Sequence, residues 1–173
     1  VSPNTENHYV PHAVQADIFK KLPKKEVAGF KADNLGEDAK DKMIFFWNNR
    51  NARRKQSGSL ALWFGEFAEE VGPENVRLLM HTDPKDPHGQ DLGLIVNQLG
   101  LDSDRQVLFS TQKVPLEQMG QFYNMADVTI NISDAEGFGL ATLESLSCGT
   151  PIIANMTGGL QEQVVGPEGE NGV

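Results

Sequence analysis

Short apolar segments alternate with helical patterns along most of this chain, and this alternation limits the possible folds more than any other feature of the sequence. The apolar segments are typical of buried strands and occupy residues 43–47, 76–81, 106–110, 127–132 and 151–154. Helical spacing of apolar residues follows them at residues 57–71, 92–100, 116–126, 140–148 and 158–165. The alternation predicts the doubly wound α/β class, a parallel sheet with helices on both faces.

The chain before residue 43 has a different texture. It is polar and interrupted by Pro23, Gly29 and Gly36, which predicts a loop with at most one turn of helix. A short strand near its start fits only at a sheet edge or end, because Pro11 cannot donate a ladder hydrogen bond. We therefore expect an N-terminal linker or edge segment, 1–41, followed by one Rossmann-like domain, 42–173.

The composition is that of an ordinary soluble protein. A length of 173 residues suffices for one domain with a sizeable core, and 39% of the residues are hydrophobic. The net charge of −9 argues against a nucleic-acid-binding protein. Cys148 is the only cysteine, which excludes an internal disulfide and favours a reducing compartment. The sequence shows no signal peptide and no apolar run long enough to cross a bilayer, so we expect a cytoplasmic protein.

A glycine pair with a glutamate on either side precedes the predicted helix 140–148. Ligands of doubly wound sheets bind beyond the carboxyl ends of the strands, where this E-G-F-G sequence falls. Gly137 and Gly139 would let an anion approach the unpaired amides of the helix start. Glu144 could accept hydrogen bonds from a vicinal diol, and Glu136 could reach a group on the far side of the anion. The alternative is a solvated glycine-rich turn with two solvated glutamates.

Basic residues cluster in the turn after the first predicted strand. Arg50, Arg53, Arg54 and Lys55 lie close together in the sequence. A solvated basic turn is one interpretation. The other is that Arg50 and Lys55 clamp a diphosphate on the same rim as the glycine pair, since arginine suits forked phosphate contacts and lysine acts as a point charge.

The loop 82–91 gathers acidic residues and one histidine, which we interpret as ordinary loop residues. One histidine is too few for a typical transition-metal site, so no metal site is expected.

These pieces together resemble the donor-binding half of the retaining GT-B glycosyltransferases of family 4, also called glycosyltransferase group 1. The family pattern runs G-R-x-x-x-x-K-G, L-x-x-x-Y-x-x-A-D, E-G-F-G-x-x-x-x-E, A-C-G-x-P-V-V-A and T-x-x-G-G-x-x-E. The chain has N-R-N-A-R-R-K-Q at 49–56 and LEQMGQFYNMADVTINISDAEGFGLATLESLSCGTPIIANMTGGLQE at 116–162. The resemblance covers about residues 8–165. It departs from the pattern at Asn49 and Gln56, where the family has glycine, and we expect asparagine to keep the left-handed turn.

The resemblance implies a role for each matching position. Arg50 and Lys55 would bind the donor diphosphate, and Glu136 would contact a hydroxyl of the transferred sugar. Glu144 would bind the ribose hydroxyls. The other expected contacts are backbone contacts to phosphate, sugar edge or base, made by Gly137, Phe138, Gly139, Leu140, Thr111, Val114, Gly158 and Gly159. Glu162 would lie nearby.

The same resemblance implies a function. The fold would be the C-terminal half of a GT-B enzyme, and the donor would be a UDP-, GDP- or ADP-sugar, with no cofactor and no metal. A glycan, lipid or small-molecule acceptor would bind a separate N-terminal domain, for which this chain has no room. We therefore expect a retaining, metal-independent hexosyltransferase that is inactive as this isolated domain. Its membrane association, if any, would be peripheral and through the full-length enzyme. The alternative is a non-catalytic nucleotide-sugar-binding module that needs a partner subunit.

Overall fold

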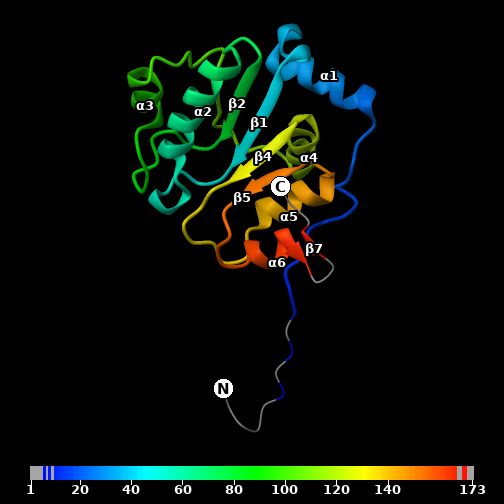
Figure 1. The fold of residues 1–173 in the computed structure, drawn as a ribbon. Helices are drawn as coiled ribbons and strands as arrows, with labels where there is room; N and C mark the ends of the chain where they lie inside the picture. The colour runs from blue at the N-terminus through cyan, green and yellow to red at the C-terminus, as the bar shows by residue number, and fades with distance from the viewer. Residues whose placement is uncertain (1–5, 7, 9, 167–168, 171–173) are drawn as a thin grey trace.

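A five-stranded parallel sheet forms the centre of the protein (Figure 1). The computed structural model describes residues 6, 8, 10–166 and 169–170. The sheet order is β3-β2-β1-β4-β5, and every neighbouring pair is parallel. The strands are β1 Met43–Asn48, β2 Val76–His81, β3 Val107–Ser110, β4 Val128–Asn131 and β5 Ile152–Ala154. Each lies within one residue of its prediction, so the α/β fold class is confirmed.

Helices cover both faces of the sheet because alternate side chains of each strand point to opposite faces. Phe45 and Trp47 of β1 belong to the core cluster that contains α2 Ser57–Val71 and α3 Leu92–Gln98. Ile44 and Phe46 belong to the second cluster, with α4 Leu116–Met125 and α5 Leu140–Cys148. The doubly wound arrangement follows, and it places the loops after β1, β2, β3 and β4 on one rim.

The N-terminal segment differs from the prediction of a loop. It forms a 12-residue helix, α1 Lys24–Leu35, followed by a 3₁₀ helix, η1 Glu37–Asp41. Phe19, Leu35 and Ala39 are buried in the second core cluster, so this segment packs on the domain. The residues expected as an edge strand, as far as the structure describes them, are not in a strand. The boundary at residue 41 stays a prediction.

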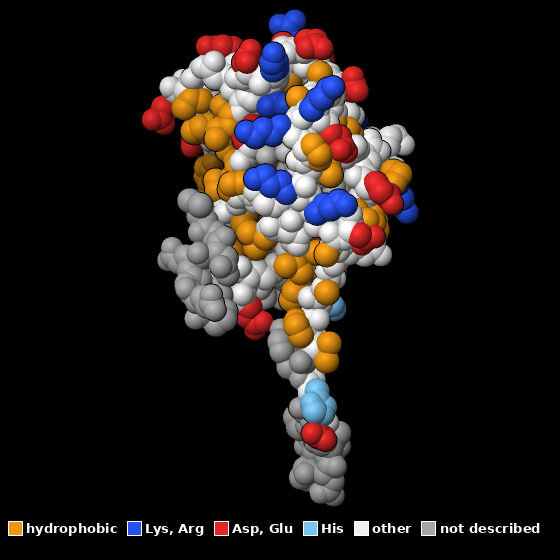
Figure 2. Space-filling view, turned by 90° about the vertical axis from the view of Figure 1, so that its right-hand side faces the viewer, with side chains coloured by type: hydrophobic (Ala, Val, Ile, Leu, Met, Phe, Trp, Pro, Cys, Tyr) orange, Lys and Arg blue, Asp and Glu red, His pale blue; other side chains and the backbone are white. Residues whose placement is uncertain are grey.

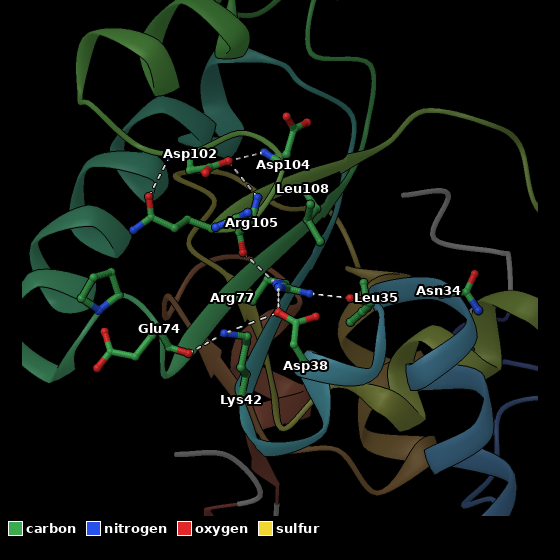
Figure 3. A pocket seen from close by; sticks show the side chains of 12 residues that line it. Asn34, Leu35, Asp38, Lys42, Glu74, Arg77, Asp102, Asp104, Arg105 and Leu108 are labelled. Carbon is green, nitrogen blue, oxygen red and sulfur yellow. Dashed lines mark hydrogen bonds and ion pairs between the residues drawn. The ribbon is translucent and has the colours of Figure 1, made fainter.

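Arg77 of β2 ties this segment to the sheet (Figure 3). Its guanidinium donates from Nη1 to the Leu35 carbonyl at 2.6 Å and from Nη2 to Asp38 Oδ2 at 3.0 Å. Nε donates to the Arg105 carbonyl at 2.8 Å. A cavity of about 660 Å³ opens beside Arg77 at the amino ends of the strands, on the rim opposite to the predicted site. The Arg77 guanidinium, called the Arg77 fork below, therefore joins the end of α1, η1 and the loop before β3.

Beyond β5 the chain forms α6 Leu160–Val164, which is shorter than predicted, and a hairpin of β6 Val165–Gly166 with β7 Gly169–Glu170. The face of β1, β4 and β5 beside α2 holds an apolar cavity of about 530 Å³, lined by residues such as Phe67 and Ile153.

Lys and Arg side chains gather on the side of the molecule that carries α1 (Figure 2). Four lysines line one depression beside α1: Lys21, Lys24, Lys31 and Lys40. The negative net charge is therefore unevenly distributed over the surface.

Candidate anion-binding site

The turn after β1 and the loop after β4 are in direct contact. Lys55 Nζ, at the end of the 3₁₀ turn η2 Arg53–Lys55, pairs with Glu136 Oε2. Arg54 Nη1 donates to the Ala135 carbonyl at 2.6 Å, and the Asp134 amide donates to the Arg54 carbonyl at 2.8 Å. The two segments that the sequence predicted to share a rim therefore lie against each other.

The Lys55–Glu136 pair is largely shielded from solvent. The two side chains are only 7% and 11% exposed. Ser133 Oγ also donates to Glu136 at 3.4 Å, and Arg54 lies 3.8 Å from its other oxygen. A buried pair of this kind adds little net stability, but removal of one partner leaves an uncompensated charge. Each member therefore needs an opposite charge or a polar partner in any ligand complex.

Gln56 holds the turn in an unusual conformation. It has φ 56° and is the one non-glycine residue with positive φ in the part of the chain that the structure describes. Its side chain donates to Asp134 Oδ2 and accepts from Ser59 Oγ at 2.9 Å. The left-handed residue is therefore Gln56, and the expectation of a left-handed Asn49 was wrong. The side-chain bonds of Gln56 offset the cost of about 1 kcal/mol that this conformation carries.

The start of α5 presents a run of backbone donors. Gly139 is the left-handed N-cap with φ 86°, and no side chain caps the helix. Among the described residues, the amides of 137–141 have no hydrogen-bond acceptor. Unpaired amides at a nine-residue helix start, together with the helix dipole, make a place where an anion is stabilised.

Gly158 and Gly159 lie directly against this run of amides. A Cβ on Gly158, which has φ 50°, would overlap the Glu136 carbonyl oxygen, and one on Gly159 would overlap the Gly137 carbonyl. The Gly159 amide donates to that Gly137 carbonyl at 2.9 Å. Both glycines are thus required for the close packing that shapes the loop 136–138. Their contact with a phosphate stays a prediction.

Glu144 is held by a relay of hydrogen bonds from β1. Asn48 Nδ2 donates to Tyr123 Oη at 2.9 Å, and Tyr123 Oη donates to Glu144 Oε2 at 2.6 Å. Burial raises the pKa of the Glu144 carboxyl, and the tyrosine hydrogen bond partly opposes that shift. Burial also raises the pKa of Tyr123 well above its ordinary value, and the charge of Glu144 adds to the shift. Sequence reasoning named Glu144 but missed the relay, although Tyr123 is part of the family pattern.

Arg50 is engaged by a residue that sequence reasoning left aside. Its Nε donates to Asp86 Oδ2 at 2.6 Å, and its Nη2 lies 2.7 Å from His88 Nδ1. The Arg50 hydrogen bond holds the pKa of Asp86 well below its usual range, and a bond from the His88 amide adds to this shift. The guanidinium side chain remains 62% exposed. Arg50 is therefore accessible, but it is oriented by the loop after β2 and makes no described contact with the glycine pair.

Arg50 and Thr111 line one shallow cavity of about 240 Å³ at the carboxyl ends of β1, β2 and β3. Thr111 is exposed there, and its contact with a base stays a prediction. Val114 instead packs against the second core cluster and is not among the residues that line this cavity.

Asn51 is fully buried between the turn after β1 and the loop after β2, two of the three segments that line this cavity. Its Nδ2 donates to the Gln90 carbonyl at 2.7 Å, and its Oδ1 accepts from Ser57 Oγ at 2.7 Å. A Cβ on Gly89 would overlap Asn51, so the loop passes very close to this side chain. Asn51 thus fixes the turn that carries Arg50 and Lys55. Its position directly after Arg50 was the only sequence signal of this role.

None of the helices in the described part of the chain is long and apolar enough to cross a membrane. No group of three or more His, Cys, Asp or Glu side chains in this part of the chain is arranged to hold a metal ion.

Sequence comparisons place the second half of the chain among known proteins. The family model "Glycosyl transferases group 1" matches residues 97–173. The D-inositol 3-phosphate glycosyltransferase of Acidothermus cellulolyticus is 45% identical over 60 residues, which are 35% of this chain and 13% of that protein. The trehalose synthase of Rubrobacter xylanophilus is 34% identical over 97 residues, 56% of this chain and 23% of that protein. The matched region is thus a small part of each relative.

Solved structures match nearly the whole chain. Sucrose-phosphate synthase from Thermosynechococcus elongatus has a TM-score of 0.70 at 25% identity, covering 88% of this chain and 35% of that one. The C-terminal domain of a group 1 glycosyl transferase from Francisella tularensis has a TM-score of 0.62 at 20% identity, covering 88% and 75%. Anabaena HepE, solved in complex with UDP, has a TM-score of 0.69 at 18% identity, covering 87% and 39%. The fold is that of a GT-B C-terminal domain, and the chain spans about a third of the synthase.

Proposed function

We propose that this chain, whose residues 97–173 match the model of the group 1 glycosyl transferases, binds the nucleotide-diphosphate sugar of such an enzyme. The relatives and the fold support a glycosyltransferase. The donor, the stereochemical course and the residue roles are proposals.

One observation carries the proposal: Lys55 and the free amides of 137–141 lie in contacting segments on the ligand rim of the sheet. A diphosphate is the ligand class that uses both a buried lysine and a run of amides at a helix start. Arg50 is exposed at the end of the same strand and can turn from Asp86 to a phosphate oxygen. HepE, a structural neighbour, was solved with a nucleoside diphosphate, which supports the same ligand class here.

In the proposed mechanism the leaving diphosphate gains negative charge while the sugar–phosphate bond breaks. Fixed positive groups that face this charge lower the barrier because they need no reorganisation during the reaction. Lys55, Arg50 and the α5 amides are those groups. The step needs no metal, and it fits a retaining reaction in which the leaving phosphate assists the acceptor on the same face of the sugar.

When the phosphate binds Lys55, Glu136 would lose part of its contact with the lysine and would accept a hydrogen bond from a sugar hydroxyl instead. Glu144 would accept hydrogen bonds from the ribose. The base, among uracil, guanine and adenine, would lie beside Thr111 in the shallow cavity. We propose that the acceptor, a glycan, a lipid or a small molecule, is bound by a further domain or subunit, so these 173 residues alone bind donor without transferring sugar.

The test is a calorimetric titration of UDP, GDP and ADP, each alone and as a sugar conjugate, into the wild type, Lys55→Ala and Glu144→Ala. We expect one nucleoside diphosphate to bind the wild type, and each substitution to weaken it by about tenfold or more, the effect of losing a charge-assisted hydrogen bond. Lys25→Ala is the matched control, because Lys25 is an exposed lysine of α1 outside this rim.

Binding that is unchanged in both site variants would refute the proposed pocket. Thermal unfolding of each variant separates this result from a loss of structure. Sugar transfer by the wild-type chain without any partner would contradict the proposal that the acceptor site lies elsewhere.

A further inference from the structure

We propose that Tyr123 is a positioning residue, which holds one oxygen of Glu144 so that the other faces the nucleotide ribose, and that Asn48 fixes the direction of the tyrosine hydroxyl. The inference rests on the proposed function, in which Glu144 binds the ribose hydroxyls. It adds two side chains to the donor site that have no assigned role.

The donor and acceptor chemistry sets the direction of the relay. An asparagine Nδ2 can only donate, so the 2.9 Å bond from Asn48 occupies a lone pair of Tyr123 Oη. The tyrosine has one hydrogen, which is then free to be donated to Glu144 Oε2 at 2.6 Å. An ionised carboxylate only accepts, so the three groups form a chain with one possible polarity.

The carboxylate has a second oxygen for which the structure shows no partner among the described residues. A ribose presents two neighbouring hydroxyl donors, and a carboxylate oxygen held at a fixed angle can accept from both. Glu144 lies about one turn inside α5, while the free amides lie at its start. The helix therefore carries the proposed ribose acceptor and the proposed phosphate donors at neighbouring positions.

Packing of Tyr123 does not require its hydroxyl. Tyr123 is 1% exposed, and its ring packs edge-on against two phenylalanines. Its ring centroid lies 5.3 Å from that of Phe46 and 6.1 Å from that of Phe19. A phenylalanine would fill the same space. A buried hydroxyl costs free energy unless it is hydrogen-bonded, so its presence here is explained by the two groups that it joins. Asn48 ends β1, two residues before Arg50, so the relay also fixes Glu144 relative to the strand that leads into the cationic turn.

The experiment compares Tyr123→Phe with the wild type, using whichever of UDP, GDP and ADP binds the wild type most tightly, and the 2′,3′-dideoxy form of that nucleotide. We expect the variant to bind the ribonucleotide about tenfold more weakly, because the carboxylate is no longer aligned. The dideoxynucleotide should bind both proteins equally, since it has no hydroxyl for Glu144. If Tyr123 had a purely structural role, the substitution would lower the affinity for both nucleotides by the same factor, and that result would overturn the inference.

Thr150→Val is the matched control. It removes another buried hydroxyl, which donates to the Tyr123 backbone carbonyl at 2.7 Å and leaves the tyrosine side chain untouched. We expect this variant to lose some stability but to keep the wild-type preference for the ribonucleotide. Loss of that preference in Thr150→Val would contradict the specific role of the tyrosine hydroxyl.

A second variant keeps the inference testable if Tyr123→Phe folds poorly. Asn48→Asp preserves the shape but offers an acceptor, which competes with Glu144 for the tyrosine hydrogen. The preference for the ribonucleotide should fall, whereas repulsion of the diphosphate by the new charge affects both nucleotides alike. An unchanged preference in both relay variants would refute the relay, while wild-type protein that binds no nucleotide would refute the proposed function instead.

Discussion

At the scale of single residues, Glu144 shows a conflict between stability and binding. Burial raises its pKa, so the folded state disfavours the ionised form relative to the unfolded chain. Its favourable contribution is complete below the ordinary glutamate pKa of 4.5 and is lost as the pH rises through the higher folded-state value. At neutral pH the protein therefore carries a destabilising charge at the place where the ribose is proposed to bind.

Glu144→Gln should consequently raise the unfolding temperature at pH 7 while it weakens nucleotide binding by about tenfold, because the amide oxygen is a weaker acceptor for the ribose than a carboxylate. Tyr123 can still donate to the amide oxygen, so the relay remains. Calorimetric unfolding between pH 4 and pH 8 checks the sign: the stability gain should shrink as the pH falls. A gain that grows toward low pH would contradict this account of Glu144.

Individual residues also show which parts of the candidate site could be predicted from the sequence. The turn that carries Lys55 and the loop that carries Glu136 were predicted to share one rim, because parallel strands bring the loops after them together, and the contact between these two residues confirms the shared rim. Asn49 was predicted as the left-handed residue from its intrinsic preference. The structure places Gln56 in that conformation instead, since bonds to Asp134 and Ser59 outweigh the local cost. The bond to Asp134 joins two loops that are distant in the sequence, so residue spacing could not predict it.

At the scale of elements, the strands were predictable because each is an apolar run, whereas α1 was not. Only Leu35 of α1 is buried, and its lysines and glycine give no clear apolar stripe. The helix is held by Val27 and Phe30, which pack against the second core cluster, and by the hydrogen bonds of Arg77 to its last residue and to η1. The sequence has an arginine, Arg77, in an otherwise apolar strand. Such an arginine indicates a buried hydrogen-bond partner, and the prediction overlooked this signal.

Arg77→Met should lower the free energy of unfolding by about 2 kcal/mol, because it leaves the Leu35 and Arg105 carbonyls without their donor. The methionine side chain still fills the space of the aliphatic part of Arg77, so the loss of stability measures the contribution of the guanidinium. Arg105→Met is the control, since the Arg105 side chain is exposed and makes no described hydrogen bond. Hydrogen exchange should show that α1 amides lose protection in the first variant only. Equal losses in both variants would show that the fork does not anchor α1.

At the scale of the whole molecule, the ligand rim is open. The cavity beside Arg50 has a volume of about 240 Å³, below the range of about 300–1,000 Å³ of typical small-molecule sites. This rim has many hydrogen-bond donors that could bind a phosphate. The described groups proposed to contact the sugar are only Glu136, which is already paired with Lys55, and the backbone near the glycine pair. In the proposed site, the chain thus offers more contacts to a diphosphate than to the sugar.

We therefore expect this chain to bind a nucleoside diphosphate and its sugar conjugate within about threefold of each other, and the monophosphate about tenfold more weakly. The diphosphate contacts supply most of the binding free energy, and tenfold corresponds to one charge-assisted hydrogen bond. Calorimetric titration of UMP, UDP and a UDP-sugar, or of the matching guanine or adenine series, measures both ratios. Glu136→Gln tests the sugar contact through the ratio of the two affinities: losing the sugar contact should change this ratio, whereas the loss of the Lys55 counter-charge changes the affinity for the diphosphate and for its conjugate alike. A sugar conjugate that binds more than tenfold better than the diphosphate would mean that these residues enclose the sugar by themselves. The proposed acceptor-binding domain or subunit would then be needed only to present the attacking hydroxyl.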